Sequence, residues 1–194
     1  MDNNRIREFF NSYAISWDDD MEDAADRIEM ILDAIAPMEG MDLLDVGAGT
    51  GVLVPFLLER KVGHITECDI SEGMMEINRR KYRDLTDISH ILGDASNLDF
   101  PQQYDRIIIY NAFPHFSDRQ QLIQNLAASL KMDSYLVIAH SRTSAELEEH
   151  HRNISSELYS HLGKAEGIAA LLEKEFTDIF FQDEPFFMVR GRKA

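Results

Sequence analysis

Three glycines at alternate positions, Gly47, Gly49 and Gly51, join two apolar segments of the chain. The first segment, residues 43–46, reads as a buried strand, and the second, residues 52–58, is typical of the start of a helix. Glycine allows positive φ angles and lets a ligand lie against bare backbone. The first N–H groups of the following helix lack internal partners, so they face any anion that rests on the turn. This pattern predicts a nucleotide-binding turn.

The spacing of the glycines favours one class of nucleotide over another. A dinucleotide-binding turn reads G-x-G-x-x-G, and its third glycine packs the helix against the strand. Val52 occupies that third position here, which makes an NAD-dependent oxidoreductase the weaker interpretation. Asp45 lies two residues before the first glycine, and Asp69 follows the next apolar segment, residues 64–68. Asp69 therefore stands about where a ribose-binding carboxylate belongs.

The D-x-G-x-G-x-G turn at residues 45–51, followed by Glu-Cys-Asp-Ile-Ser-Glu-Gly-Met-Met at 67–75, resembles the class I S-adenosylmethionine-dependent methyltransferases. The resemblance continues through residues 93–95, 104–108 and 136–139, and so covers nearly the whole chain in the expected order. It implies a Rossmann-like, doubly wound α/β sheet that is mostly parallel with an antiparallel last strand. It also implies S-adenosyl-L-methionine as the cofactor.

The resemblance further implies roles around the methionine and ribose of this cofactor. Asp45 is expected to organise the glycine turn near the methionine end, and Thr50 to offer its hydroxyl and N–H to the methionine carboxylate. The backbone is expected to approach the cofactor at three positions, Gly47, Ala48 and Gly49. Asp69 is expected to accept hydrogen bonds from both ribose hydroxyls. Glu67 is the rival acid and shares a strand face with Asp69, but the position at the end of the strand favours Asp69.

A second group of expected contacts surrounds the adenine and the methyl group. By resemblance, Asp94 receives the adenine amino group and the Ala95 N–H meets the ring nitrogen. Ile70 and Leu92 are expected beside the adenine faces, although apolar residues there are equally consistent with ordinary core. Asn111 ends the fourth expected strand, at the point where the methyl group and the acceptor should meet.

Histidines follow the fourth and fifth expected strands. Holding donor and acceptor collinear supplies much of the catalysis of methyl transfer, and a base is needed only when the acceptor must lose a proton. Residues 110–116 lack both the Asn-Pro-Pro-Tyr motif of amino-methylating DNA enzymes and a cysteine nucleophile. Histidine can act as a base near neutral pH or bind a metal. His115 and His140 are the candidate catalytic residues, His150 and His151 are also consistent with helix surface, and no metal site is predicted.

Two N-terminal helices are expected before the first strand, over residues 4–17 and 21–36, and together they form a cap over residues 1–37. The first of them resembles the segment that covers the cofactor in small-molecule members of the family. Tyr13 and Trp17 are therefore candidates for the cofactor pocket.

The remaining chain alternates between strands and helices, which indicates a parallel α/β sheet. Strands are expected near residues 42–46, 64–68, 88–92, 105–110 and 134–139. Helices are expected over residues 52–60, 72–82, 118–130, 144–160 and 165–175. Two final strands, 177–182 and 186–192, are close enough in sequence to form a hairpin, so the last should run antiparallel.

The net charge, the cysteine content and the lack of long apolar runs indicate which kinds of partner to expect. The net charge of −16, from 35 acidic and 19 basic residues, repels a phosphate backbone, so nucleic acid is not an expected partner. The single cysteine, Cys68, fits a reducing compartment, and no apolar run approaches the length of a membrane span. A cytoplasmic protein with no membrane partner is expected, and the sequence carries no indication of its oligomeric state.

These observations predict a single methyltransferase domain over residues 1–194, with its Rossmann-like core at 41–194. The expected activity is methyl transfer from S-adenosylmethionine to an unidentified, small-molecule acceptor. The alternative from another class is a non-catalytic protein that binds S-adenosylmethionine without turnover, since intact cofactor residues do not separate the two.

Overall fold

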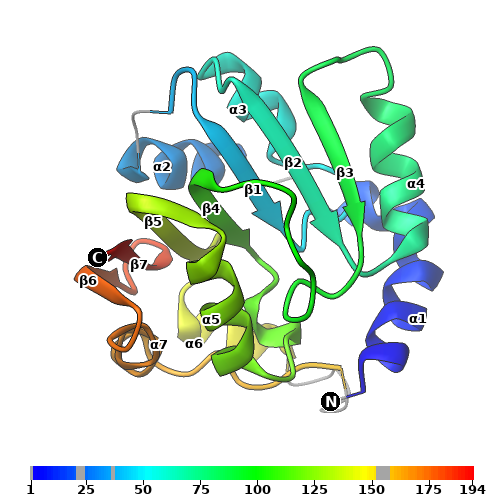
Figure 1. Ribbon diagram of the computed structural model, residues 1–194. Coiled ribbons are helices and arrows are strands. Elements are labelled where there is room, and N and C mark those ends of the chain that lie inside the picture. Colours follow the sequence, from blue (N-terminus) through cyan, green and yellow to red (C-terminus); the bar gives the residue numbers. More distant parts are fainter. Residues whose placement is uncertain (1, 21–24, 36–37, 152–157) are drawn as a thin grey trace.

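The computed structural model describes residues 2–20, 25–35, 38–151 and 158–194, and it is built around one seven-stranded sheet (Figure 1). The strand order is β3-β2-β1-β4-β5-β7-β6. The strands are β1 (Asp42–Val46), β2 (His64–Asp69), β3 (Ile88–Leu92), β4 (Tyr104–Tyr110), β5 (Leu130–His140), β6 (Phe176–Gln182) and β7 (Phe187–Lys193). The pairs among β1 to β5 are parallel, and β7 runs antiparallel to both β5 and β6.

Helices cover both faces of this sheet (Figure 1). They are α1 (Asn3–Tyr13), α2 (Ala25–Ile35), α3 (Val54–Glu59), α4 (Glu72–Lys81), α5 (Arg119–Ala128), α6 (Ser144–His151) and α7 (Ala165–Leu172). Short 3₁₀ helices span η1 (Ala14–Asp20) and η2 (Phe113–His115). Successive strand residues face opposite sides, so Leu43 and Ile65 join the core under α2 and α3, whereas Leu44 and Val46 join the core on the other side. Among the described residues, no helix combines the length and the apolar character that crossing a membrane requires.

The strand order reverses between β1 and β4, and that reversal positions the site. Chain connections leave β1 and β4 in opposite directions, so a crevice opens at the carboxyl ends of these two strands. The arrowheads of β1 to β3 point to the end of the molecule where α1 lies beside α4 (Figure 1). The N-terminal helix therefore stands at the ligand-binding edge of the sheet.

The predicted fold class and the antiparallel final hairpin are confirmed. β5 begins at Leu130, earlier than expected, because Leu130 pairs with Tyr104 across a register shift. The helix expected over residues 4–17 ends at Tyr13 and continues as the 3₁₀ helix η1.

Two expected helices extend beyond the described residues. Residues 21–24 and 36–37 of the second N-terminal helix lie outside them, as do residues 152–157 of the helix expected over 144–160. Residues 158–160 are not helical. The helix that follows β5 is therefore described only from Ser144 to His151.

Candidate active site

A cavity opens at the carboxyl ends of the central strands, and segments far apart in sequence line it. The predicted residues that line it are Trp17, Gly47, Ala48, Gly49, Asp69, Ile70, Asp94, Ala95, Asn111 and His115. Four other predicted residues, Tyr13, Asp45, Thr50 and His140, are not part of the lining. Most of the predicted residues beside the sheet therefore line the cavity, and of the two predicted cap residues Trp17 does.

The glycine turn forms one wall of the cavity, through Gly47, Ala48 and Gly49. Gly47 has a φ of 75°, and a Cβ there would lie 2.4 Å from the Cβ of Ala112, so a side chain is excluded by packing as well as by conformation. At Gly49 the nearest neighbour of an added Cβ would be Trp17 Nε1, at an ordinary van der Waals distance of 3.9 Å. The backbone at Gly49 is therefore bare toward the cavity, as close approach of a nucleotide requires.

Asp69 ends β2 and is held by two backbone donors. Its Oδ2 accepts from the Gly49 N–H at 2.9 Å and its Oδ1 from the Ser71 N–H at 2.8 Å. Burial raises the pKa of Asp69, and these N–H donors partly offset that increase. Each carboxylate oxygen has more than one acceptor position, so the side chain retains capacity for ribose hydroxyls. The rival acid, Glu67, is fully buried and does not line the cavity.

Asp94 and its neighbours form the wall after β3. Asp94 Oδ2 accepts from Asn3 Nδ2 and from Asn97 Nδ2, each at 2.7 Å. Ile70 and Ala95 also line the cavity, whereas Leu92 is 41% exposed and is not part of the lining. Asn3 was not predicted, because its contact with Asp94 spans 91 positions of sequence.

Asn111 connects the ends of the two strands on the acceptor side. Its φ of 53° is left-handed, which asparagine tolerates better than most residues. Its Oδ1 accepts from the Ser141 N–H at 2.9 Å, and its backbone N–H donates to Ala139 O at 2.9 Å. The loop after β4 is thereby fixed to the end of β5, with Asn111 facing the cavity.

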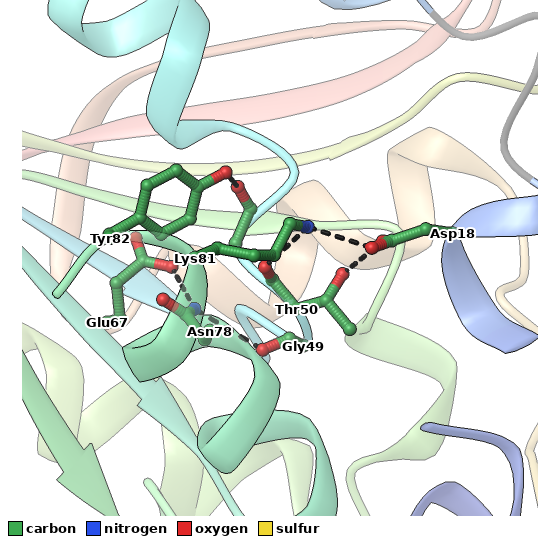
Figure 2. A network of polar contacts seen from close by, with 8 residues as sticks. Asp18, Gly49, Thr50, Glu67, Asn78, Lys81 and Tyr82 are labelled. Atoms are coloured by element: carbon green, nitrogen blue, oxygen red, sulfur yellow. Dashed lines mark hydrogen bonds and ion pairs between the residues drawn. The ribbon is translucent and has the colours of Figure 1, made fainter. Parts of the chain in front are cut away.

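Asp45 and Thr50 are both buried behind the turn. The Thr50 hydroxyl donates to Asp18 Oδ1 at 2.6 Å, and Lys81 Nζ donates to Asp18 Oδ2 at 2.9 Å and to Thr50 O at 3.0 Å (Figure 2). We refer to Asp18, Thr50 and Lys81 as the latch, because they fasten η1 to the glycine turn and to α4. The expected contact between Thr50 and the methionine carboxylate stays a prediction.

The cap contributes more to the cavity than was predicted. Trp17 lines it as expected, and so do Ile6 and Phe10 on α1. Tyr13 instead is half exposed, with its ring 4.7 Å from that of Phe9. The spacing of Ile6 and Phe10 in the sequence could have indicated their role, because residues four positions apart share one helix face.

The two candidate histidines lie in different environments. His115 lines the cavity, and its Nδ1 lies 2.8 Å from Leu158 O. A carbonyl only accepts, so Nδ1 carries the proton and Nε2 is the basic nitrogen of the neutral ring. Burial lowers the pKa of His115, which keeps the ring neutral at pH 7.

His140 is also buried, but its ring packs at 5.8 Å from that of Phe187, away from the cavity. It follows the correct strand, yet its side chain belongs to the core between β5 and β7. Of the two candidate histidines, His115 alone lines the cavity, and the base assignment of His140 loses its geometric support.

The latch provides a first test of the cap. We expect Asp18→Ala to weaken retention of S-adenosylmethionine by about two- to tenfold, the equivalent of one hydrogen bond of roughly 0.5–1.5 kcal/mol net. Trp17 is the single tryptophan and lines the cavity, so its fluorescence can follow release of the ligand. Asp84→Ala removes an exposed charge outside the latch and should leave the release rate unchanged. Equal release rates in the two variants would show that the latch does not hold the cap over the ligand.

Comparison with known proteins agrees with this geometry. A methyltransferase domain family matches residues 43–133. A malonyl-[acyl-carrier protein] O-methyltransferase of Acetivibrio thermocellus is 34% identical over 100 residues, which are 51% of this chain and 35% of the relative. A demethylmenaquinone methyltransferase of Thermotoga maritima is 36% identical over 111 residues, which are 56% of this chain and 47% of the relative. The chain thus spans less than half the length of these two relatives.

Solved structures show the same fold. The N-methyltransferase NodS from Bradyrhizobium japonicum, in complex with S-adenosyl-L-homocysteine, superposes with a TM-score of 0.74 at 16% identity and full coverage of both chains. A putative methyltransferase of Haloferax volcanii, in complex with the Trm112 activator, superposes with a TM-score of 0.79 at 18% identity, covering 95% of this chain and 97% of that one.

The fold, the bare glycine turn and the strand-end acid define a Rossmann-like nucleotide-binding protein. With the match of residues 43–133 to a methyltransferase domain family, the chain is similar to S-adenosylmethionine-dependent methyltransferases in its central sequence blocks as well as in its fold.

Proposed function

We propose that this chain transfers the methyl group of S-adenosylmethionine to a small-molecule acceptor. The proposal rests on one observation. A single cavity is lined both by the residues expected to hold the methyl donor and by the residues expected near the acceptor. Gly49, Asp69 and Asp94 line the donor side, and Asn111 and His115 line the acceptor side.

The residues present fit the cofactor. The backbone at Gly49 is bare toward the cavity, and Asp69 retains acceptor capacity for two hydroxyls. When bound, S-adenosylmethionine supplies an electrophilic methyl group on a sulfonium that leaves as a neutral thioether. Asp69 would hold the ribose, and Asp94 with Ala95 would hold the adenine.

The chain's own contribution on the acceptor side is alignment and proton removal. Asn111 and the 3₁₀ helix η2 would hold the acceptor in line with the methyl group. The acceptor's lone pair forms the new bond to carbon, while the electrons of the breaking carbon–sulfur bond stay on sulfur. For a protonated acceptor atom, the proton passes to Nε2 of His115, the nitrogen that the Leu158 contact leaves basic.

The cavity and the charge favour a compact acceptor with an apolar or aromatic part. Ile6, Phe10, Ala112 and Phe116 line the cavity around His115, and the Phe10 ring lies edge-on to His115 at 5.0 Å. The net charge of −16 disfavours nucleic acid. The names of the two relatives specify a quinone and an acyl-carrier-bound acid, both compatible with an enclosed pocket.

Calorimetry and a transfer assay test this function. We expect S-adenosylmethionine and S-adenosylhomocysteine to bind and NAD not to bind. Methyl-labelled S-adenosylmethionine should label at least one compound in a panel of phenols, amines, carboxylic acids and quinols. Binding of NAD in place of S-adenosylmethionine would contradict the donor assignment, and donor binding without any labelling would favour the non-catalytic binding protein.

A further inference from the structure

Two buried acids lie side by side behind the glycine turn. Asp45 on β1 and Glu67 on β2 are direct partners in the parallel register, so their side chains project from the same face of the sheet. Their exposed fractions are 1% and 0%. Neither lines the cavity, so the cofactor contacts described above leave them unexplained.

Their oxygens are only partly satisfied. Glu67 Oε2 accepts from Asn78 Nδ2 at 2.7 Å. Glu67 Oε1 and Asp45 Oδ1 are buried and have no hydrogen-bond partner within the described parts of the chain. Two adjacent buried carboxylates repel each other strongly when both are ionised, and one proton held between them removes most of that cost.

Burial and the charge of Asp69 add to the cost of ionising the two acids. Burial raises the pKa of Glu67 to about 7, with Asp69 adding to the increase and Asn78 and Lys81 opposing it. Burial raises the pKa of Asp45 as well, and the charges of Glu67 and Asp69 contribute.

Other titratable groups around the pair come from the neighbouring elements. Tyr82 on α4 and Tyr110 on β4 face the pair, and burial raises the pKa of each phenol, so both stay neutral at pH 7. His90 on β3 reaches it indirectly, through the 2.9 Å contact of its Nε2 with Asn78 Oδ1, and burial lowers its pKa. Asp18 on η1 accepts a hydrogen bond from Lys81, the last residue of α4. Burial therefore leaves the two phenols neutral and disfavours the charged forms of Asp45 and Glu67.

A short connection links the acids to the ligand side. Asn78 Nδ2 donates to Glu67 Oε2 and also to Gly49 O, at 3.3 Å, so one amide bridges the buried acid and the turn (Figure 2). Gly49 and Asp69 both line the cavity. A positive charge in the cavity would therefore act on the pair through the turn and a largely dry interior, where charges interact more strongly than in water.

We propose that Asp45 and Glu67 share one proton in the ligand-free site and release it to solvent when S-adenosylmethionine binds. This inference rests on the proposed function. The bound donor carries a sulfonium, which favours the ionised pair, whereas the product S-adenosylhomocysteine carries a neutral thioether at the same position. The pair thus sets the preference for donor over product, and the preference increases as the pH rises.

The direction and the size of this pH dependence follow from the linkage between proton release and donor binding. At low pH the pair must lose its proton before it fully attracts the sulfonium, so donor affinity increases with pH until the pair is ionised. One proton changes affinity by at most about tenfold per pH unit, and we expect the ratio of the two dissociation constants to change by about three- to tenfold between roughly pH 6 and 8.

Calorimetry in phosphate and Tris, two buffers with different ionisation enthalpies, counts the protons released. At about pH 7 we expect S-adenosylmethionine to release several tenths of a proton more than S-adenosylhomocysteine. Both ligands share the amino and carboxylate groups, so the difference reports the sulfonium. Glu67→Gln keeps an oxygen acceptor for Asn78 and should abolish the difference, and Asp45→Asn provides a second variant should the first fail to fold.

Asp133→Asn is the matched control, because it removes one distant acidic charge at a left-handed position that asparagine tolerates. It should release protons as the natural chain does. Equal release with both ligands, or an unchanged difference in Glu67→Gln, overturns the inference while leaving the proposed function intact. If neither ligand binds, the proposed function fails as well.

Discussion

Replacement of His115 by alanine is expected to lower the turnover of an acceptor that loses a proton by roughly 10²- to 10⁴-fold, the usual contribution of a general base. The hydrogen bond from Nδ1 to Leu158 O fixes the tautomer in which Nε2 is basic, and His115 lines the acceptor side of the cavity. The donor's dissociation constant should change by less than about twofold, since the expected donor contacts lie on the other side. Steady-state kinetics and calorimetry on the same preparation measure the two effects.

The pH dependence of turnover provides the control for this prediction about His115. Burial lowers the pKa of His115 below its ordinary value of 6.5, so turnover of the natural chain should fall only as the pH drops through that lowered value. His161→Ala removes an exposed histidine and should keep the natural profile. If His115→Ala turns over the acceptor as fast as the natural chain, with the same pH profile, alignment alone drives the reaction.

Replacement of Asp69 by alanine is expected to weaken binding of S-adenosylmethionine by roughly ten- to a hundredfold, from the loss of about 1.5–3 kcal/mol of hydrogen bonding to a charged acceptor. The same change leaves the Gly49 and Ser71 N–H groups without their acceptor, so part of the loss comes from a loosened turn. Asp69→Asn retains one carbonyl oxygen and should have an intermediate effect.

Calorimetry measures the affinities of these variants, and circular dichroism checks that each is folded. Asp87→Ala, at an exposed position before β3, should bind as the natural chain does. A folded Asp69→Ala variant with natural affinity would remove Asp69 from the ribose site.

The parts of the site that were predictable from sequence are those in which position along a strand decides location. The glycine turn follows β1, Asp69 ends β2 and Asp94 lies two residues after β3, and parallel strands bring such residues to one edge of the sheet. The same reasoning failed for His140, which ends its strand but points into the core beside Phe187. Strand position gives the edge of the sheet, and only packing decides whether a side chain there reaches the cavity.

The cap was less predictable because its contacts depend on how distant segments meet. The Asn3 amide finds Asp94, and Asp18 finds Thr50, through contacts that no local spacing encodes. From the sequence, Glu67 is only an alternative to Asp69 for binding the ribose, because nothing in its strand indicates that Asn78 on α4 donates a hydrogen bond to it. The contacts of each of these residues are set by tertiary packing and not by local propensity.

The close approach of Gly47 and Ala112 affects how this chain can be re-engineered. A Cβ at residue 47 would lie 2.4 Å from the Cβ of Ala112, so the loop that carries the acceptor side rests directly on the loop that carries the donor side. A library that enlarges residue 112 to reshape acceptor selectivity would displace the glycine turn and forfeit donor affinity. Directed evolution toward new acceptors should therefore spare residue 112 and vary Ser117, which lines the cavity and is not among the nearest neighbours of a Cβ at residue 47.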